Sequence, residues 1–295
     1  MKVALSSASR RVLSMIPWRM RSLNNFLMAS ANWLFEDVIR TPPVRIATGV
    51  SVEAHSLICH RDVNMALTSV KSFMRYMPAV ALVLHDDGSI TQLDRALLSE
   101  HLPGARFIGR AEADREMQRI LPSDVYAKRA QHVFLLKLFD FNHFHDGQTT
   151  ILLDSDIVFL APPTEVINWL ASEAAAPFYN LDWCPSYRAS SVPDGLTIPP
   201  KLNAGFMGYR GRFSMKQIYD YCARMDYWIE DQTIYALLLA DLDAKALDPN
   251  RYRVYTGGSI APDTPMVHFI SPSRFKALLY PRLARRVYRE LRRIR

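Results

Sequence analysis

The sequence predicts an α/β fold in which a mostly parallel β-sheet carries helices on both of its faces. In the first half of the 295-residue chain, short apolar segments alternate with longer segments whose apolar residues recur at helical spacing. The apolar segments lack the polar–apolar alternation of a strand with one wet face, which indicates burial on both faces. Strands and helices that alternate in this way are typical of a parallel sheet.

The first half of the chain supplies four predicted strands and three predicted helices. Asp62 is expected to cap the helix that begins at Val63, because its carboxylate can accept hydrogen bonds from the first free amides. Pro78 and the dipeptide Pro103-Gly104 separate successive strand–helix units. In chain order, the predicted elements are a strand at 55–59, a helix at 63–74, a strand at 79–84, a helix through Leu93 to Leu98, a strand at 105–108, a helix at 124–141 and a strand at 149–153.

The composition limits the class of protein. Hydrophobic residues make up 49% and charged residues 22% of the chain, which is ordinary for a globular protein with a sizeable core. The length suits one large domain with extensions at its ends. The three cysteines are odd in number and form no Cys-x-x-Cys pair, so we expect neither a disulfide framework nor a zinc ribbon. This cysteine usage fits the cytoplasm.

The two ends of the chain are expected to differ from its middle. We divide the sequence into a lead-in at 1–50 with amphipathic character, a main domain at 51–278 and a basic helix at 279–295. The net charge of +7 is concentrated in arginines near both ends, which could bind an anionic membrane surface or could simply be solvated. No apolar run reaches the roughly 18 residues that a membrane span needs, and no signal peptide is predicted.

Polar residues gather immediately after three of the predicted strands, at 60–62, 85–87 and 154–156. The carboxyl ends of parallel strands meet at one edge of a sheet, and ligands bind in the crevice at that edge. The sequence therefore predicts a binding site formed by these three segments.

Two carboxylates, Asp154 and Asp156, interrupt the apolar run 151–160. In extended chain, residues two apart point to the same face, so these carboxylates should converge while Ser155 turns away. Unpaired carboxylates repel one another at such a separation, and a divalent cation would relieve the repulsion. Oxygen ligands favour Mg²⁺ or Mn²⁺ over zinc. Two alternatives are a pair of surface aspartates and the aspartate pair of a phosphatase that forms an aspartyl phosphate.

With this motif, the sequence resembles the GT-A glycosyltransferases, a Rossmann-like fold class in which an Asp-x-Asp motif ends a central strand. It is most similar to glycosyltransferase family eight and its bacterial relatives. The resemblance covers residues 55–276, which would make 51–278 the catalytic domain. Further segments match in the expected order, namely Asn203-Ala204-Gly205, Asp231-Gln232 and Val267-His268-Phe269.

The resemblance implies a role for each of the matching residues. Asp154, Asp156 and His268 would bind Mn²⁺ or Mg²⁺, which would bridge the donor phosphates. Asp231 and Gln232 would be catalytic. If the enzyme inverts, Asp231 or Glu230 would be a general base; if it retains, Asp231 and Gln232 would stabilise the donor. Helix capping is the alternative. The residues expected to contact the nucleotide-sugar donor are His60, Arg61, Asp62, Lys137, Asp154, Ser155, Asn203, Gly205, Arg274 and Lys276.

Several of these assignments have plain structural alternatives. His60, Arg61 and Asp62 could be a helix cap with solvated charges, and Lys137 could lie on a surface face. Asp182 and Trp183 follow a predicted strand at 177–181 and could contact the acceptor, with Trp183 stacking on a sugar ring or packing in the core.

The function that the resemblance implies is a metal-dependent transfer of a hexose from a UDP-sugar to a glycan, glycolipid or polysaccharide of the cell envelope. We expect the enzyme to be cytoplasmic, with peripheral association with the anionic inner membrane face, and to have no nucleic-acid partner. The alternatives are the aspartate-dependent phosphatase and a non-catalytic module that binds nucleotide sugars. A dinucleotide oxidoreductase is disfavoured because no Gly-x-Gly-x-x-Gly follows the first strand.

Overall fold

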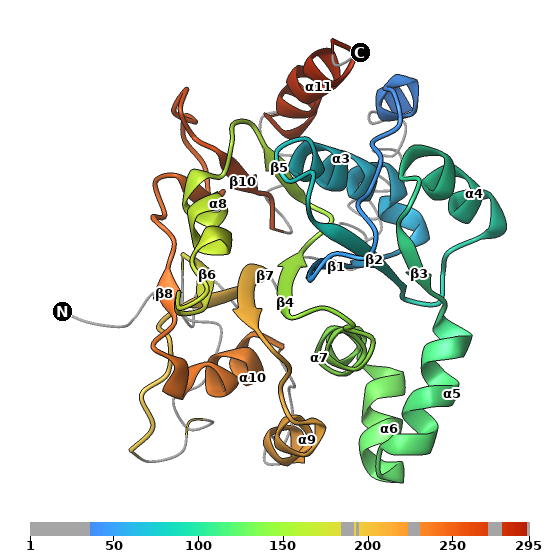
Figure 1. The fold of residues 1–295 in the computed structure, drawn as a ribbon, viewed down its shortest axis with the longest axis vertical. Coiled ribbons are helices and arrows are strands. Elements are labelled where there is room, and N and C mark those ends of the chain that lie inside the picture. The colour runs from blue at the N-terminus through green and yellow to red at the C-terminus, as the bar shows by residue number, and fades with distance from the viewer. Residues whose placement is uncertain (1–35, 184–191, 193–194, 224–230, 271–278, 294–295) are drawn as a thin grey trace, which may run out of the picture.

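The computed structural model describes residues 36–183, 192, 195–223, 231–270 and 279–293. Its elements alternate between strand and helix through the first half of the chain, as the sequence predicts (Figure 1). In chain order they are η1 Glu36–Arg40, β1 Val52–Ile58, η2 His60–Asp62, α3 Val63–Met74, β2 Ala81–Asp86, α4 Gln92–His101, β3 Arg106–Ile108, α5 Arg110–Ile120, α6 Ser123–Gln131, α7 Val133–His143, β4 Thr149–Leu153, β5 Ile157–Phe159, α8 Thr164–Ala171, β6 Phe178–Leu181, β7 Leu202–Arg210, α9 Met215–Ala223, α10 Asp231–Leu238, η4 Ala240–Leu242, β8 Lys245–Ala246, β9 Tyr252–Val254, β10 Met266–His268 and α11 Leu279–Leu291.

A seven-stranded sheet in the order β3-β2-β1-β4-β7-β6-β8 forms the centre of the molecule. The four neighbours β3, β2, β1 and β4 run parallel, while β7 pairs antiparallel with both β4 and β6. The prediction of a mostly parallel α/β sheet is confirmed. The carboxyl ends of β1, β2 and β4 therefore lie at the same edge, where the segments 60–62, 85–87 and 154–156 begin.

A second, three-stranded sheet joins the end of the domain to the segment after β4. In it β10 pairs antiparallel with β5 and parallel with β9. The register places His268 opposite Ile157, the first residue of β5. A histidine from late in the chain is thereby brought beside Asp156.

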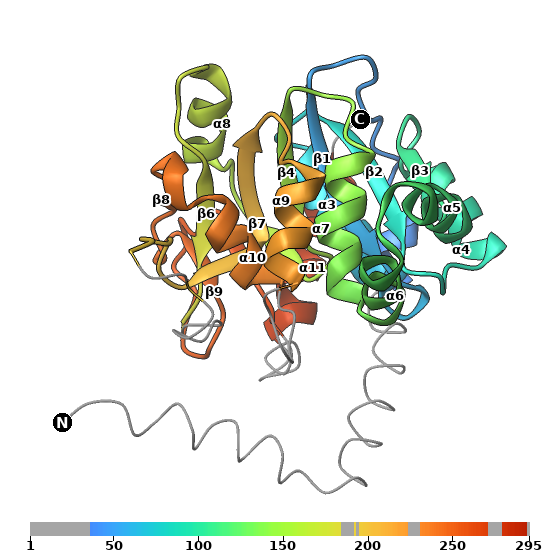
Figure 2. The ribbon, with the colours of Figure 1, turned by 90° about the horizontal axis from the view of Figure 1, so that it is seen from below.

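Helices cover both faces of the central sheet. The helices α3 and α11 lie on one face, and α7, α9 and α10 lie on the other (Figures 1 and 2). The strand β4 shows how the sequence serves both layers, because Ile151 and Leu153 belong to the core under α3 while Leu152 belongs to the core under α7. An apolar strand without polar alternation is what this double burial requires.

The predicted helix at 124–141 is wrong in one respect, because it is two helices that meet at His132. The backbone of His132 is extended, with φ −121° and ψ 108°. Arg129 on α6 binds Asp140 on α7 through two hydrogen bonds of 2.7 and 2.6 Å. In a continuous helix these residues would lie about 16 Å apart along the axis, so this buried pair requires the break.

Two further details differ from the sequence prediction. Asp62 precedes α3 but makes no capping hydrogen bond, because its carboxylate accepts hydrogen bonds from Arg61 instead. The helix α5 was not predicted from the sequence. It is mostly polar and buries only Ala113 and Met117, so its apolar pattern is too weak to indicate a helix.

The basic helix α11 packs through one face against α3. Tyr288 lies 2.7 Å from the Thr68 hydroxyl on α3, and Arg75, which directly follows α3, binds Glu290 at 2.7 Å. The apolar residues of α11 are buried in the core, whereas Arg282, Arg285 and Arg289 are exposed. In the part of the chain that the structure describes, no helix combines the length and hydropathy of a membrane span.

Candidate functional site

Three strands bring the candidate metal ligands together at the carboxyl edge of the sheet. Asp154 follows β4 directly, and its amide donates to the Gly205 carbonyl of β7 at 2.8 Å. Asp156 lies in the turn between β4 and β5, and its carbonyl accepts a hydrogen bond from the amide of Phe269, which follows His268, at 2.9 Å. The two carboxylates thus converge as expected, although a turn rather than an extended chain brings them together.

The ligand-type atoms of Asp154, Asp156 and His268 all lie within 4.8 Å of one another. His268 Nε2 is 3.1 Å from Asp156 Oδ1 and 3.9 Å from Asp154 Oδ2. Asp156 and His268 are buried, whereas the Asp154 side chain is 30% exposed and leaves the group open on one side. Burial lowers the pKa of His268, but the hydrogen bond to Asp156 and the charges of Asp156, Asp154 and Asp182 together outweigh this effect and raise the pKa.

Gly205 leaves the space that this group occupies. A Cβ atom at this position would lie 2.3 Å from His268 Cε1 and 2.8 Å from Asp154 Oδ2. Both distances are too short for non-bonded atoms. Glycine is required here by the close approach of the two side chains, a reason separate from the donor contact that the resemblance implies.

Lys137 links the metal-type group to Asp231. Its ammonium lies 2.8 Å from Asp154 Oδ1 and 3.1 Å from Asp231 Oδ2, and its side chain is buried. Burial alone lowers the pKa of Lys137, but the charges of Asp154 and Asp231 outweigh it and raise the pKa above its ordinary value. The surface alternative for Lys137 is excluded, and the sequence did not reveal that one lysine holds both carboxylates.

The helix α10 presents Asp231 and Gln232 at its first turn. The Tyr235 hydroxyl donates to the Lys137 carbonyl at 3.1 Å, which fixes α10 against α7. The Asp231 carboxylate accepts a hydrogen bond from the Gln232 amide at 3.0 Å, so Asp231 also binds a free backbone amide in the first turn of the helix. Among the described residues, the buried Gln232 Oε1 has no hydrogen-bond partner.

Asp182 and Asn203 form a second polar pair beside the carboxylates. Asn203 donates to Asp182 Oδ2 at 3.1 Å and accepts from the Gly205 amide at 2.9 Å. Trp183 is 53% exposed, so the alternative that it packs in the core is excluded. Ser155 is half-buried in the turn between the two aspartates.

The remaining candidates are not brought into this group. His60 binds Asp94 at 2.7 Å and Arg61 binds Asp62 at 3.0 Å, while both side chains stay more than half exposed. They lie beyond the end of β1, at the same edge of the sheet. Glu230, Arg274 and Lys276 fall outside the described residues.

Comparisons with known structures identify the fold. A galactosyltransferase, LgtC, solved with donor and acceptor sugar analogues, matches over 83% of this chain and 98% of its own, with TM-score 0.55 and 15% identity. The chain has the GT-A fold. Mouse xyloside xylosyltransferase 1 matches over 76% and 99% of the two chains, with TM-score 0.50 and 16% identity. The Streptococcus pneumoniae glycosyltransferase GlyE matches over 81% and 63%, with TM-score 0.52 and 13% identity. Family models and curated protein sequences give no match.

Proposed function

We propose that this protein is a metal-dependent glycosyltransferase that transfers a hexose from a UDP-sugar to a glycan, glycolipid or polysaccharide acceptor of the cell envelope. The observation that carries the proposal is the convergence of Asp154, Asp156 and His268 at the carboxyl edge of a GT-A sheet. Two carboxylates and one imidazole suit Mn²⁺ or Mg²⁺, and the lack of a Cβ at Gly205 leaves room for His268 and Asp154.

In this proposal, Asp154, Asp156 and His268 hold the cation. When bound, the cation supplies Lewis-acid stabilisation of the nucleoside diphosphate that leaves the sugar. Asp154 is the partly exposed member, so the donor phosphates would approach from its side. Lys137 keeps Asp154 oriented and adds positive charge next to the leaving diphosphate.

The sugar would lie near Asp231, Gln232 and the Asp182–Asn203 pair. The buried and unpaired Oε1 of Gln232 is an acceptor suited to a donor hydroxyl, and Asn203 is held in one orientation by its two hydrogen bonds. Exposed Trp183 offers a flat face for an acceptor sugar. In an inverting reaction Asp231 would be the base; in a retaining one Asp231 and Gln232 would stabilise positive charge on the donor sugar.

The deciding experiment measures the melting temperature and donor turnover of three proteins, namely wild type, Asp156→Ala and the control Asp220→Ala. Asp220 is a surface residue of α9 whose partner is Lys216. We expect UDP to stabilise the wild type and the control only with Mn²⁺, and Asp156→Ala to lose this effect together with turnover of UDP-hexoses. UDP binding that is equal in all three proteins, or phosphate release from simple phosphoesters without nucleotide binding, would overturn the proposal.

We further propose that the cytoplasmic enzyme works at the anionic inner membrane face. The support is the exposed basic side of α11, since an arginine close to anionic lipid contributes about 1 kcal/mol. Co-sedimentation with vesicles rich in phosphatidylglycerol should fall when Arg282, Arg285 and Arg289 are replaced by glutamate. Equal sedimentation of the variant and the wild type, or equal binding to neutral vesicles, would contradict membrane association through this helix.

A further inference from the structure

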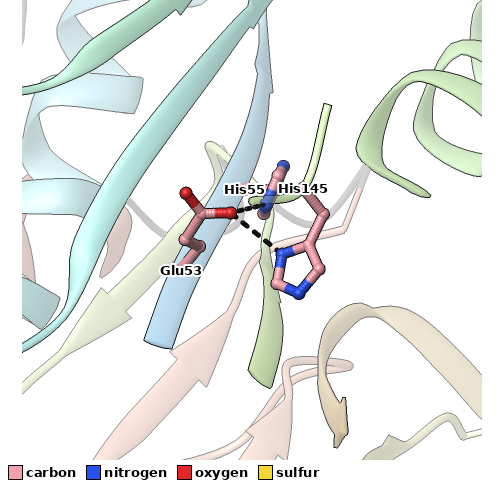
Figure 3. A group of neighbouring side chains, drawn as sticks. All are labelled: Glu53, His55 and His145. Atoms are coloured by element: carbon pink, nitrogen blue, oxygen red, sulfur yellow. Dashed lines mark ion pairs between the residues drawn. The ribbon is translucent and has the colours of Figure 1, made fainter. Parts of the chain in front are cut away.

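A second group of ligand-type side chains lies between the sheet and α7. Glu53 and His55 are two residues apart on β1 and point to the same side, and His145 comes from the segment between α7 and β4 (Figure 3). Glu53 Oε2 is 2.9 Å from His145 Nδ1 and 3.4 Å from His55 Nε2. All three residues are buried, and their ligand-type atoms lie within 4.8 Å of one another.

The imidazole nitrogens of this group are unsatisfied as hydrogen-bonding atoms. Within the described residues, His55 Nε2 and both ring nitrogens of His145 are buried and have no hydrogen-bond partner. Two of them face Glu53 Oε2 at the distances above, where a protonated ring would form an ion pair and a neutral ring could share a cation with the carboxylate. Buried polar atoms without partners destabilise the folded state. A shared metal ion would bind two of these three atoms, His55 Nε2 and His145 Nδ1.

A third histidine, His85, orients His55 for such a role. His55 Nδ1 lies 3.0 Å from His85 Nε2, and the two rings are stacked with centroids 5.2 Å apart. If His55 donates its Nδ1 proton to His85, its Nε2 keeps a lone pair directed at Glu53. A hydrogen bond from the other ring nitrogen is the usual way in which a protein orients a metal-binding histidine.

The charges around the group leave room for a cation. Arg106 lies 3.4 Å from Glu53 Oε1 and also binds Asp146 and the Phe144 carbonyl. Glu53 and Asp146 together outweigh Arg106 by one negative charge. Glu53 Oε2 accepts hydrogen bonds from the Asp146 and Gly147 amides at 2.9 and 3.2 Å, and these contacts fix the carboxylate in place.

We propose that Glu53, His55 and His145 form a binding site for Zn²⁺, separate from the Asp154 group. Four ligands around zinc at about 2.0–2.1 Å lie about 3.4 Å from one another, close to the observed 2.9 and 3.4 Å. Two imidazoles and one carboxylate suit zinc better than magnesium. A cavity of about 540 Å³ lined by Glu53, Arg106, Asp146 and Gly147 lies next to the group and can admit the ion and a water ligand.

This zinc would join β1 to the segment that leads from α7 into β4. The segment connects α7, which carries Lys137, to β4, which Asp154 follows directly. Phe141, one turn after Lys137 on α7, contacts both His55 and His85. The site is therefore structural, and its main effect is on stability.

The test uses Asp156→Ala as the background, because this change removes the first metal group. Three proteins are compared, namely Asp156→Ala alone, Asp156→Ala with His145→Gln, and Asp156→Ala with the exposed His132 changed to Gln as a matched control. Each is equilibrated with Zn²⁺ and dialysed, and zinc content and melting temperature are measured. We expect about one zinc per chain and a melting temperature raised by about 5 °C in the first and third proteins at 100-fold excess over the dissociation constant. In the His145→Gln protein the zinc affinity should fall at least tenfold.

Zinc content and melting temperature that do not differ between the His145→Gln protein and its control would overturn the proposal, as would the absence of zinc from all three. If His145→Gln does not fold, Co²⁺ replaces Zn²⁺ in the Asp156→Ala protein. The intense visible absorption of tetrahedral Co²⁺ supports the site, and the weak absorption of an octahedral ion overturns it.

Discussion

Replacing Gly205 with alanine tests whether the close approach of two side chains decides metal binding. The new Cβ would lie 2.3 Å from His268 Cε1, whereas carbon atoms in favourable contact are about 3.5–4.0 Å apart. The ring must therefore retreat by about 1.2 Å, the difference between 2.3 and 3.5 Å. Metal–ligand distances tolerate only about 0.2 Å. We expect Mn²⁺ affinity to fall by about 10–100-fold or more, and unfolding free energy by about 1–3 kcal/mol.

The matched control is Gly208→Ala on the same strand. Its Cβ would lie 2.4 Å from Phe178 Cε1, a clash of the same size with a residue that is not a candidate metal ligand. Mn²⁺ affinity is measured by calorimetry, and stability by urea unfolding without metal. Both variants should lose similar stability, but Gly208→Ala should bind Mn²⁺ like the wild type. If the two variants bind Mn²⁺ equally well, the reasoning about Gly205 is refuted.

Three further predictions concern buried charges. Lys137→Met should lower the free energy of unfolding in urea by about 3–5 kcal/mol, because it leaves the carboxylates of Asp154 and Asp231 without their positive partner. A loss below about 1 kcal/mol would contradict this. Arg129→Met should lower the free energy of unfolding by a similar amount, because it removes the ion-pair partner of Asp140, yet donor KM should not change; a raised KM would contradict a purely structural role for Arg129. Burial lowers the pKa of Lys71 to about 8, below its unfolded value, so the folded state releases this proton first and stability should rise between about pH 8 and pH 10.4. The unfolding free energy of wild type minus that of Lys71→Met should increase over this range, and a flat difference would exclude the lowered pKa.

The local pattern of the sequence was sufficient for the strands and for the carboxylate pair. An apolar run ending in Asp154-Ser155-Asp156 predicted both a buried strand and a cation site, because charge at the end of such a strand needs a partner. The boundary between α6 and α7 could not be predicted in the same way. The helical pattern continues through His132, and only the contact between Arg129 and Asp140 requires the break.

By itself, the sequence determined the α/β fold class, the alternation of strands and helices in the first half of the chain, and the edge of the sheet at which polar residues gather. Each of these depends on neighbours in the chain, through apolar spacing and the residues that end each strand. Only the tertiary structure decided that Lys137 holds Asp154 and Asp231, that Gly205 leaves space for His268, and that Glu53 meets His55 and His145. These contacts join residues that are far apart in the sequence, apart from the short spacing between Glu53 and His55. Their geometry is set by strand register and by helix packing across the sheet, which no local pattern specifies.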